Sequence, residues 1–304
     1  MERPHPLDGH SHAHPRRIGV IGGSGLYDVE GLTDVAWVDV DTPFGAPSDA
    51  ILTGRLGDRA LAFLPRHGRG HRVPPHRINY RANLYAMKKL GVEWIVSVSA
   101  VGSMREEIHP GDVLVPDQYI DRTNGRPATF FEDGIVAHVT FSDPACRPLR
   151  AALTEAARSA GVRAHDKGTY VCIDGPQFST RAESQMYRSF GVDVIGMTAL
   201  PEAKLAREAE LCYATLALVT DYDCWHSSGE EVSVAAVLAV LQKNISVARN
   251  VVRKVAALVS PERVCPCPTA LDAAIMTSPD RVPPEARSRL SAIIERVDRG
   301  RGRS

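Results

Sequence analysis

Residues 18–25 read Ile-Gly-Val-Ile-Gly-Gly-Ser-Gly, a short apolar run that ends in three glycines around one serine. An apolar run of this length bounded by glycine is typical of a buried strand, and the glycines predict a turn where the backbone approaches another group closely. The backbone N–H groups of such a turn, together with the Ser24 hydroxyl, form a concave set of donors that suits a phosphate. An ordinary tight turn is the alternative, and this loop taken alone favours neither interpretation.

Three well-known glycine motifs do not fit this loop. Asp28 stands where a dinucleotide-binding fingerprint needs its third glycine, and the Lys-Ser or Lys-Thr pair of a P-loop is absent. Leu26 stands where a nucleophile elbow needs a glycine. The general interpretation as an anion-binding turn is the functional one that remains.

Outward from this strand, short apolar runs alternate with helical patterns, several of which are closed by glycine. The apolar runs predict strands and the periodic stretches predict helices. We expect strands at 18–21, 61–64, 94–99, 168–173, 193–195 and 213–219, and helices at 82–90, 148–160, 181–190, 202–210, 234–259 and near 284–297. This alternation predicts an α/β fold.

The chain divides into three parts. Residues 1–17 are predicted to be a flexible His-rich tail, residues 18–260 a single domain without a linker, and residues 261–304 a C-terminal extension with Cys265-Pro-Cys267 and a terminal helix. The 36 Lys plus Arg balance 36 Asp plus Glu, and 44% of the residues are hydrophobic. This composition disfavours both a protein that binds nucleic acid by neutralising phosphates and a disordered chain.

The six cysteines are too sparse and irregular for a secreted disulfide scaffold, and no spacing among them predicts a zinc site. We therefore expect no metal and a cytoplasmic location, since neither a signal peptide nor a membrane-spanning stretch is apparent. A disulfide between Cys265 and Cys267 would close a strained ring, so two free thiols are expected. The His-x-His-x-His run at 10–14 is interpreted as a solvated tail in preference to a metal site.

Two further predicted strand ends carry groups suited to an anion. Arg66 and His67 directly follow one strand, where a planar guanidinium and an imidazole can donate to phosphate. Ser97 and Ser99 stand at the end of another. Because ligands in open α/β sheets bind beyond the carboxyl ends of the strands, we expect these loops to converge on one small anion.

Acidic residues follow the apolar run at 213–219. Asp221 and Asp223 are separated by one residue, Tyr222, and come directly after that predicted strand. Such a pair is commonly a solvated turn, but its position at a strand end favours a proton-handling role.

Eight motifs, in this order, resemble the methylthioadenosine phosphorylases of the trimeric purine nucleoside phosphorylase family. They are Gly22-Gly23-Ser24-Gly25-Leu26, Asp41-Thr42-Pro43-Phe44-Gly45, Arg66-His67-Gly68-Arg69-Gly70-His71, Asn79-Tyr80-Arg81-Ala82-Asn83, Gly102-Ser103-Met104-Arg105-Glu106-Glu107, Gly175-Pro176-Gln177-Phe178-Ser179-Thr180-Arg181-Ala182-Glu183-Ser184, Gly196-Met197-Thr198-Ala199-Leu200-Pro201-Glu202 and Thr220-Asp221-Tyr222-Asp223-Cys224-Trp225. The resemblance extends from about residue 18 to residue 260.

The resemblance implies a single α/β domain with a mixed, partly barrel-like central sheet flanked by helices, assembled as a homotrimer. It implies phosphorolysis of 5′-methylthioadenosine to adenine and 5-methylthioribose 1-phosphate, a reaction of purine and methionine salvage. Inorganic phosphate is a co-substrate, and no metal or organic cofactor is expected. The implied partners are small molecules, with neither nucleic acid nor membrane among them.

The resemblance also assigns roles to residues. The phosphate-binding residues are Ser24, Arg66, His67, Ser99, Ala100 and Thr198; the nucleoside-binding residues are Phe178, Met197, Asp221, Tyr222 and Asp223; and Ser179 and Val234 affect specificity. Asp221 is implied as the general acid at purine N7.

Three alternatives remain open at this point. Carboxylates at 221 and 223 accept hydrogen bonds from a 6-amino group, which favours adenine, but a broader phosphorylase acting on adenosine or on 6-oxopurine nucleosides is the alternative substrate class. A nucleoside hydrolase would release adenine without phosphate. A non-enzymatic nucleotide sensor on the same scaffold would lack the acids.

Overall fold

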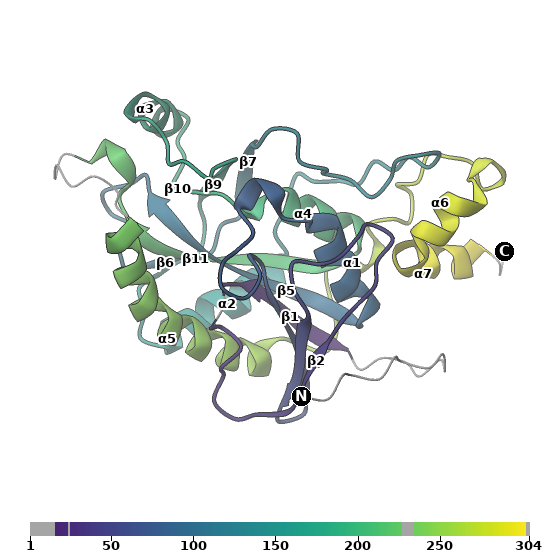
Figure 1. The fold of residues 1–304 in the computed structure, drawn as a ribbon, viewed down its shortest axis with the longest axis horizontal. Coiled ribbons are helices and arrows are strands. Elements are labelled where there is room, and N and C mark those ends of the chain that lie inside the picture. Colours follow the sequence, from purple (N-terminus) through teal and green to yellow (C-terminus); the bar gives the residue numbers. More distant parts are fainter. Residues whose placement is uncertain (1–15, 24, 227–233, 302–304) are drawn as a thin grey trace.

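The computed structural model describes residues 16–23, 25–226 and 234–301, which form a mixed sheet with helices on both faces (Figure 1). The strands in these residues are β1 (Arg17–Gly22), β2 (Leu32–Val38), β3 (Ile51–Leu56), β4 (Arg59–Pro65), β5 (Val92–Ser103), β6 (Val113–Leu114), β7 (Gln118–Arg122), β8 (Ala164–His165), β9 (Thr169–Ile173), β10 (Val194–Gly196) and β11 (Cys212–Asp221). The main path runs β2-β3-β4-β1-β5-β10-β9-β7, and β11 pairs with β5 and β6, with β8 beyond β6. The predicted α/β class and mixed sheet are confirmed.

Four parallel strands point the same way at the centre of the sheet. β1 lies between β4 and β5 and is parallel to both, and β11 runs parallel to β5 on the other side. Their carboxyl ends therefore meet at one edge, where Gly22 pairs with Pro65 and Asp221 with Gly102. The predicted convergence of strand ends is present for β1, β4 and β11, but β5 continues to Ser103, so Ser97 and Ser99 lie within a strand and not at its end.

The strand β5 changes partners along its length. It pairs with β1 as far as Ser97, and with the antiparallel β10 only from Gly102 onward. Among the described residues, no strand pairs with residues 98–101 on that side. This change of partner opens a space within the sheet at the middle of β5.

The helices form two layers. α2 (Arg147–Ser159) and α5 (Val234–Leu258) pack on the face that buries Trp94 and Val96, whereas α1 (Tyr80–Lys89) and α4 (Ala199–Glu208) pack on the opposite face with Ile95. The alternation of these three β5 side chains between two cores follows from the two-residue period of a strand. α3 (Arg181–Ser189) lies beyond the sheet, and its first turn is fixed by a capping box between Thr180 and Glu183.

The C-terminal extension packs into the hydrophobic core on the face of the sheet that carries α1. The sequence predicted one helix near 284–297, whereas the structure has α6 (Pro284–Arg289) and α7 (Ser291–Arg301), separated at Leu290. Leu290 and Ile293 are almost completely buried in the same core as α1. Leu290 has φ −95° and ψ 7°, outside the helical range, so α6 ends there although the buried positions on both sides keep the spacing of one amphipathic helix.

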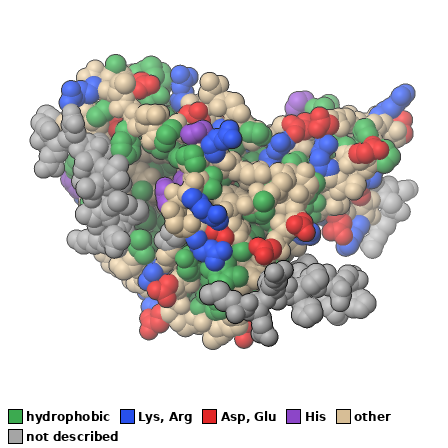
Figure 2. Space-filling model, viewed as in Figure 1, with side chains coloured by type: hydrophobic (Ala, Val, Ile, Leu, Met, Phe, Trp, Pro, Cys, Tyr) green, Lys and Arg blue, Asp and Glu red, His purple; other side chains and the backbone are tan. Residues whose placement is uncertain are grey.

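Charges of both signs are interspersed over the face shown in Figure 2, in keeping with the balanced composition. In the part of the chain that the structure describes, no helix combines the length and apolar character needed to cross a bilayer. The predicted tail at 1–17 falls almost entirely outside the described residues.

Candidate active site

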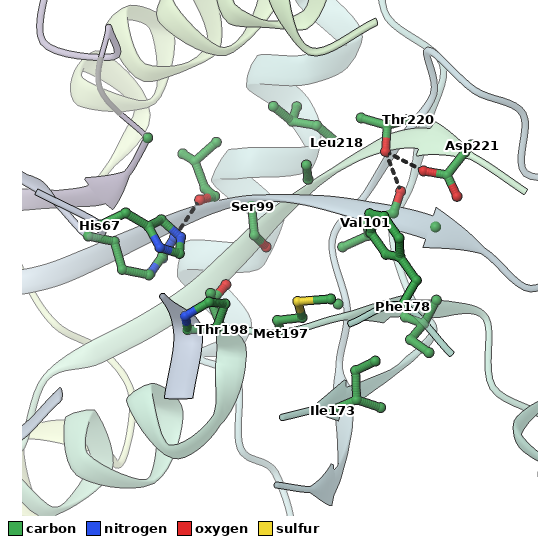
Figure 3. A pocket seen from close by; sticks show the side chains of 18 of the residues that line it. His67, Ser99, Val101, Ile173, Phe178, Met197, Thr198, Leu218, Thr220 and Asp221 are labelled. Atoms are coloured by element: carbon green, nitrogen blue, oxygen red, sulfur yellow. Dashed lines mark hydrogen bonds between the residues drawn. The ribbon is translucent and has the colours of Figure 1, made fainter. Parts of the chain in front are cut away.

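A cavity of about 630 Å³ lies where β5 changes partners. Its walls come from the ends of the parallel strands and from the segments around β9, β10 and α4; the lining includes Gly23, Arg66, His67, Ser99, Ala100, Gly102, Phe178, Ser179, Met197, Thr198, Asp221 and Asp223. Figure 3 shows His67, Ser99 and Thr198 toward one end, Asp221 and Phe178 toward the other, and Met197 between them. Most residues predicted for the site are thus brought together.

Two buried hydroxyls mark the first end of the cavity. Ser99, at the middle of β5, and Thr198, directly before α4, both line it and are less than a tenth exposed. Within the described residues, neither Ser99 Oγ nor Thr198 Oγ1 makes a hydrogen bond of good geometry. Buried hydroxyls normally have a partner, so this pair suits a polar ligand with several acceptor oxygens.

Arg66 is tied into the wall behind these hydroxyls. The Nε and Nη2 atoms donate to the two oxygens of Glu202, at 2.8 and 3.0 Å, and both residues are buried. Nη2 also donates to Ser97 Oγ at 2.7 Å, and Nη1 donates to the Val98 carbonyl at 2.8 Å. The sequence predicted a guanidinium fork directed at phosphate, but in this structure the fork is directed at Glu202 because a buried arginine needs a paired counter-charge.

His67 is a neutral donor fixed by its neighbours. Burial, followed by the charge of Arg66, lowers its pKa to about 4, and its ring stacks on His71 with centroids 4.2 Å apart. Nδ1 lies 2.9 Å from the Val73 carbonyl, which can only accept, so the neutral ring carries its proton on Nδ1 and leaves Nε2 as an acceptor. The sequence predicted that this imidazole donates to phosphate, but in this structure its one N–H is used by Val73.

Asp221 forms the second end of the cavity. Burial raises the pKa of its carboxyl above the usual range, although hydrogen bonds from Thr220 and Asp223 act against the shift. Thr220 Oγ1 lies 2.7 Å from Asp221 Oδ2 and 3.2 Å from the Val101 carbonyl. A protonated Oδ2 can donate to this hydroxyl while the hydroxyl donates to Val101, so the contacts accommodate a neutral carboxyl.

Asp223 lies beside Asp221 and supports it. Its backbone N–H donates to Asp221 Oδ1 at 2.8 Å, and its own Oδ2 accepts a 2.5 Å hydrogen bond from Ser184 of α3. Burial raises the pKa of Asp223 as well. Tyr222, between the two acids, is directed away: it is not in the cavity lining, and its hydroxyl lies 2.6 Å from His109 Nδ1. The expectation that Tyr222 contacts the nucleoside is therefore not supported by its position.

The apolar walls between the two ends come from Phe178 and Met197. Phe178 lines the cavity and is still 45% exposed, which leaves its ring available to a planar ligand. Ser179 also lines the cavity, and its buried Oγ has no hydrogen-bond partner within the described residues. The predictions for Ser24 and for the side chain of Val234 fall outside what the structure describes.

Two buried charged residues that support the site were not assigned roles from the sequence. Glu202 is the partner of Arg66, although the two are 136 positions apart. Arg126 donates from Nη1 to the Met197 and Leu200 carbonyls, each at 2.8 Å, and so fixes the segment that carries Thr198. Glu202 is the last residue of the motif Gly196-Met197-Thr198-Ala199-Leu200-Pro201-Glu202, so this motif could have pointed to it. Nothing in the sequence pointed to Arg126.

Comparisons with known proteins agree with this geometry. A family model described as the Phosphorylase superfamily matches residues 17–257. A Geobacter sulfurreducens protein named S-methyl-5'-thioadenosine phosphorylase is 59% identical over 278 residues, which are 91% of this chain and 97% of that protein.

Solved structures give the same picture. The methylthioadenosine phosphorylase from an Antarctic soil metagenomic library is 49% identical, with a TM-score of 0.88 over 92% of this chain and 99% of that chain. The Schistosoma mansoni methylthioadenosine phosphorylase in complex with adenine is 40% identical, with a TM-score of 0.77 over 81% of this chain and 92% of that chain.

Proposed function

The chain belongs to the methylthioadenosine phosphorylases of the Phosphorylase superfamily, and we infer from this membership that it splits 5′-methylthioadenosine with inorganic phosphate. The products are adenine and 5-methylthioribose 1-phosphate. In the reaction the bond between the anomeric carbon and purine N9 breaks, and a bond from that carbon to a phosphate oxygen forms.

The observation that carries the proposal is the two-ended cavity (Figure 3). Departure of the purine leaves positive charge on the ribose and negative charge on the base, so the site must stabilise both at once. A phosphate bound by the unpartnered hydroxyls at one end supplies negative charge beside the ribose, and an acid that burial favours in neutral form at the other end supplies a proton to the base.

We propose that phosphate occupies the end formed by Ser99, Ala100 and Thr198. The two hydroxyls donate to its oxygens, and the backbone after β1 reaches the cavity at Gly23. The family resemblance adds the hydroxyl of Ser24, the next residue, as a further donor. The positive charge of Arg66 lies behind the anion and is partly neutralised by its ion pair with Glu202. His67 lines the same end of the cavity. The bound phosphate faces the developing oxocarbenium ion and then attacks the anomeric carbon.

Asp221 is the proposed general acid. When the nucleoside is bound, the single proton of the neutral Asp221 carboxyl is shared with purine N7 in place of Thr220 as electrons move onto the base. Phe178 and Met197 keep the base and ribose in place. Asp223 positions Asp221 through its backbone N–H. Both acids accept from a 6-amino group, which favours adenine over a 6-oxopurine. The chemistry requires neither a metal nor an organic cofactor.

The test is the release of adenine from methylthioadenosine by the purified chain with and without phosphate. We expect release only when phosphate is supplied, with equimolar 5-methylthioribose 1-phosphate. Release without phosphate would identify a hydrolase, and no release would contradict the proposal. Adenosine and inosine in the same assay decide between the narrow enzyme and the broader purine nucleoside phosphorylase; faster cleavage of inosine would overturn the specificity assigned to the acids.

We also propose that the enzyme acts as a homotrimer in the cytoplasm. Support for the location comes from the six cysteines, none of which forms a disulfide in the structure, as expected in a reducing compartment. The trimer follows from the family resemblance, and its test is argued at the end of the Discussion.

A further inference from the structure

Four of the six cysteines come together far from the active site. Cys146 precedes α2, Cys212 begins β11, and Cys265 and Cys267 follow α5. Their Sγ atoms all lie within 4.8 Å of one another, and Cys212 Sγ is 3.5 Å from Cys265 Sγ. The spacing in the sequence did not indicate this cluster, because only the fold brings residues 146 and 212 to the Cys-Pro-Cys segment.

The geometry points to a structural zinc site formed by the thiolates of Cys146, Cys212, Cys265 and Cys267. We propose that the chain binds one Zn²⁺ there. Zinc–sulfur bonds of about 2.3 Å place the four sulfurs of a tetrahedral site about 3.8 Å apart. The Sγ atoms here lie within 4.8 Å of one another, so the longest Sγ–Sγ distances need to shorten by only about 1 Å to enclose an ion. Four-sulfur tetrahedral sites favour zinc or iron over harder metals.

Burial of the cluster supports a closed, structural site. Cys146, Cys212 and Cys267 are at most 4% exposed and belong to the core between α2 and α5. Cys265 is the half-buried member and gives an ion a route from solvent. Zinc replaces the four thiol protons, which are released to solvent, and no oxidant is consumed.

The backbone around the cysteines is held by contacts that do not involve sulfur. The Cys146 N–H donates to the Tyr213 carbonyl at 2.7 Å, which fixes Cys146 beside the start of β11. On the other side, Arg263 Nη1 donates to the Glu210 carbonyl at 2.7 Å, two residues before Cys265. Zinc would therefore connect two preformed parts, the start of β11 and the segment after α5.

This site is separate from the catalytic cavity. Cys212 and Asp221 stand at opposite ends of β11, which at about 3.3 Å per residue are roughly 30 Å apart. None of the four cysteines lines the cavity. The proposed ion therefore stabilises the attachment of the C-terminal segment and takes no part in phosphorolysis.

The experiment measures metal per chain by elemental analysis of tag-free protein, with His10, His12 and His14 replaced by Ala so that the tail cannot contribute. After brief EDTA treatment we expect about one zinc per chain. Cys265→Ser should retain at least tenfold less zinc, whereas the matched control Cys224→Ser, at another half-buried cysteine outside the cluster, should retain it fully.

Two further readouts separate zinc binding from a general effect on folding. Cobalt added to metal-free protein should give the visible absorption of tetrahedral Co²⁺ thiolate in the control variant but not in Cys265→Ser. Removal of metal should lower the Tm of the parent and leave that of Cys265→Ser unchanged.

Several results would overturn the proposal. One is a metal-free protein with six titratable thiols that takes up no added zinc, which would leave the cluster as simple packing. Another is a pair of disulfides whose reduction does not create zinc binding. Bound iron in place of zinc, or equal zinc retention in Cys265→Ser, would also exclude it.

Discussion

Asp221 has a role that its amide analogue cannot perform. Asp221→Asn keeps the size of the side chain but removes the acidic proton, so we expect kcat/KM for methylthioadenosine to fall by about 10²–10⁴. The KM for phosphate should change little, because phosphate is proposed to bind at the other end of the cavity. Relative activity on inosine should rise, since an amide N–H can donate to a 6-oxo group.

The pH profile of the same variant has a definite sign. Burial raises the pKa of Asp221, and the protonated form is the active one, so kcat/KM of the parent should decrease as pH rises through that pKa. Asp221→Asn should lack this decrease, while Asp280→Asn, a substitution at an exposed carboxylate, should retain it. A loss of activity below tenfold would remove Asp221 from the role of general acid.

The raised pKa of Glu208 in α4 predicts that the stability of the protein depends on pH. Burial raises its pKa to about 7, although Phe130 N–H and Thr129 Oγ1 donate to its oxygens at 2.7 and 2.8 Å. The unfolded chain releases this proton near pH 4.5, whereas the folded chain holds it to about pH 7. The free energy of unfolding therefore decreases as pH rises through this window, by up to about 3 kcal/mol from this group.

Glu208→Gln isolates this contribution. The amide oxygen accepts from the Phe130 N–H, and the amide nitrogen donates to Thr129 Oγ1, whose hydroxyl can accept; the side chain no longer titrates. Urea unfolding between pH 4.5 and 7.5 should show that the parent loses stability relative to the variant as pH rises. Parallel curves for the two proteins would mean that Glu208 titrates normally.

At the scale of elements, the side chains of Asp221 and Ile195 can lie against β5 because residue 102 is glycine. A Cβ on Gly102 would lie 2.9 Å from Asp221 Oδ1 and 3.2 Å from Ile195 Cγ2. Gly102→Ala should therefore displace Asp221 and lower kcat/KM by about tenfold or more, with a smaller loss of stability. Gly300→Ala, whose added methyl meets no atom within 4 Å, is the control for both kinetics and Tm. Full activity of Gly102→Ala would show that Asp221 need not occupy its present position.

Elements whose burial follows a simple pattern were predictable from the sequence. β1, β4 and β11 are nearly continuous apolar runs because both of their faces are covered, and they were found close to their observed bounds. β2 was missed because its middle residues are exposed and a register shift interrupts its pairing with β3. Its sequence therefore has neither an apolar run nor a regular alternation.

Contacts between residues far apart in the sequence limit how much of the site can be predicted from the sequence. Asp221 and Asp223 were found because they come at the end of an apolar strand. β11 ends at Asp221, and Asp223 has a left-handed φ of 52°, so the local turn after the strand, which no sequence pattern indicated, brings both acids to the cavity while Tyr222 faces away. The Arg66–Glu202 pair and the four-cysteine cluster join residues tens to more than a hundred positions apart. No local pattern encodes such contacts; they appear only when the strands and helices are placed together.

At the scale of the whole molecule, one apolar patch bears on assembly. The segments around Val136 and Met276 are paired, with an isolated bridge between Ala137 and Ile275 and a 2.9 Å hydrogen bond from the Met276 N–H to the Val136 carbonyl. The side chains of Val136 and Met276 remain 46% and 65% exposed in the single chain. Adjacent apolar side chains in water are typical of a surface that a second subunit covers.

Light scattering coupled to size exclusion tests this role. The parent should have a mass of about 99 kDa, three times the 33.0 kDa of one chain. Val136→Asp combined with Met276→Asp should shift the mass toward one chain, because burying two carboxylates in an interface costs several kcal/mol. Val35→Asp, at an exposed valine on β2, should stay trimeric. A double variant that stays trimeric would place the interface elsewhere. A parent mass of 33.0 kDa, the mass of one chain, would contradict the homotrimer itself, since Val136 and Met276 would then stay exposed to water.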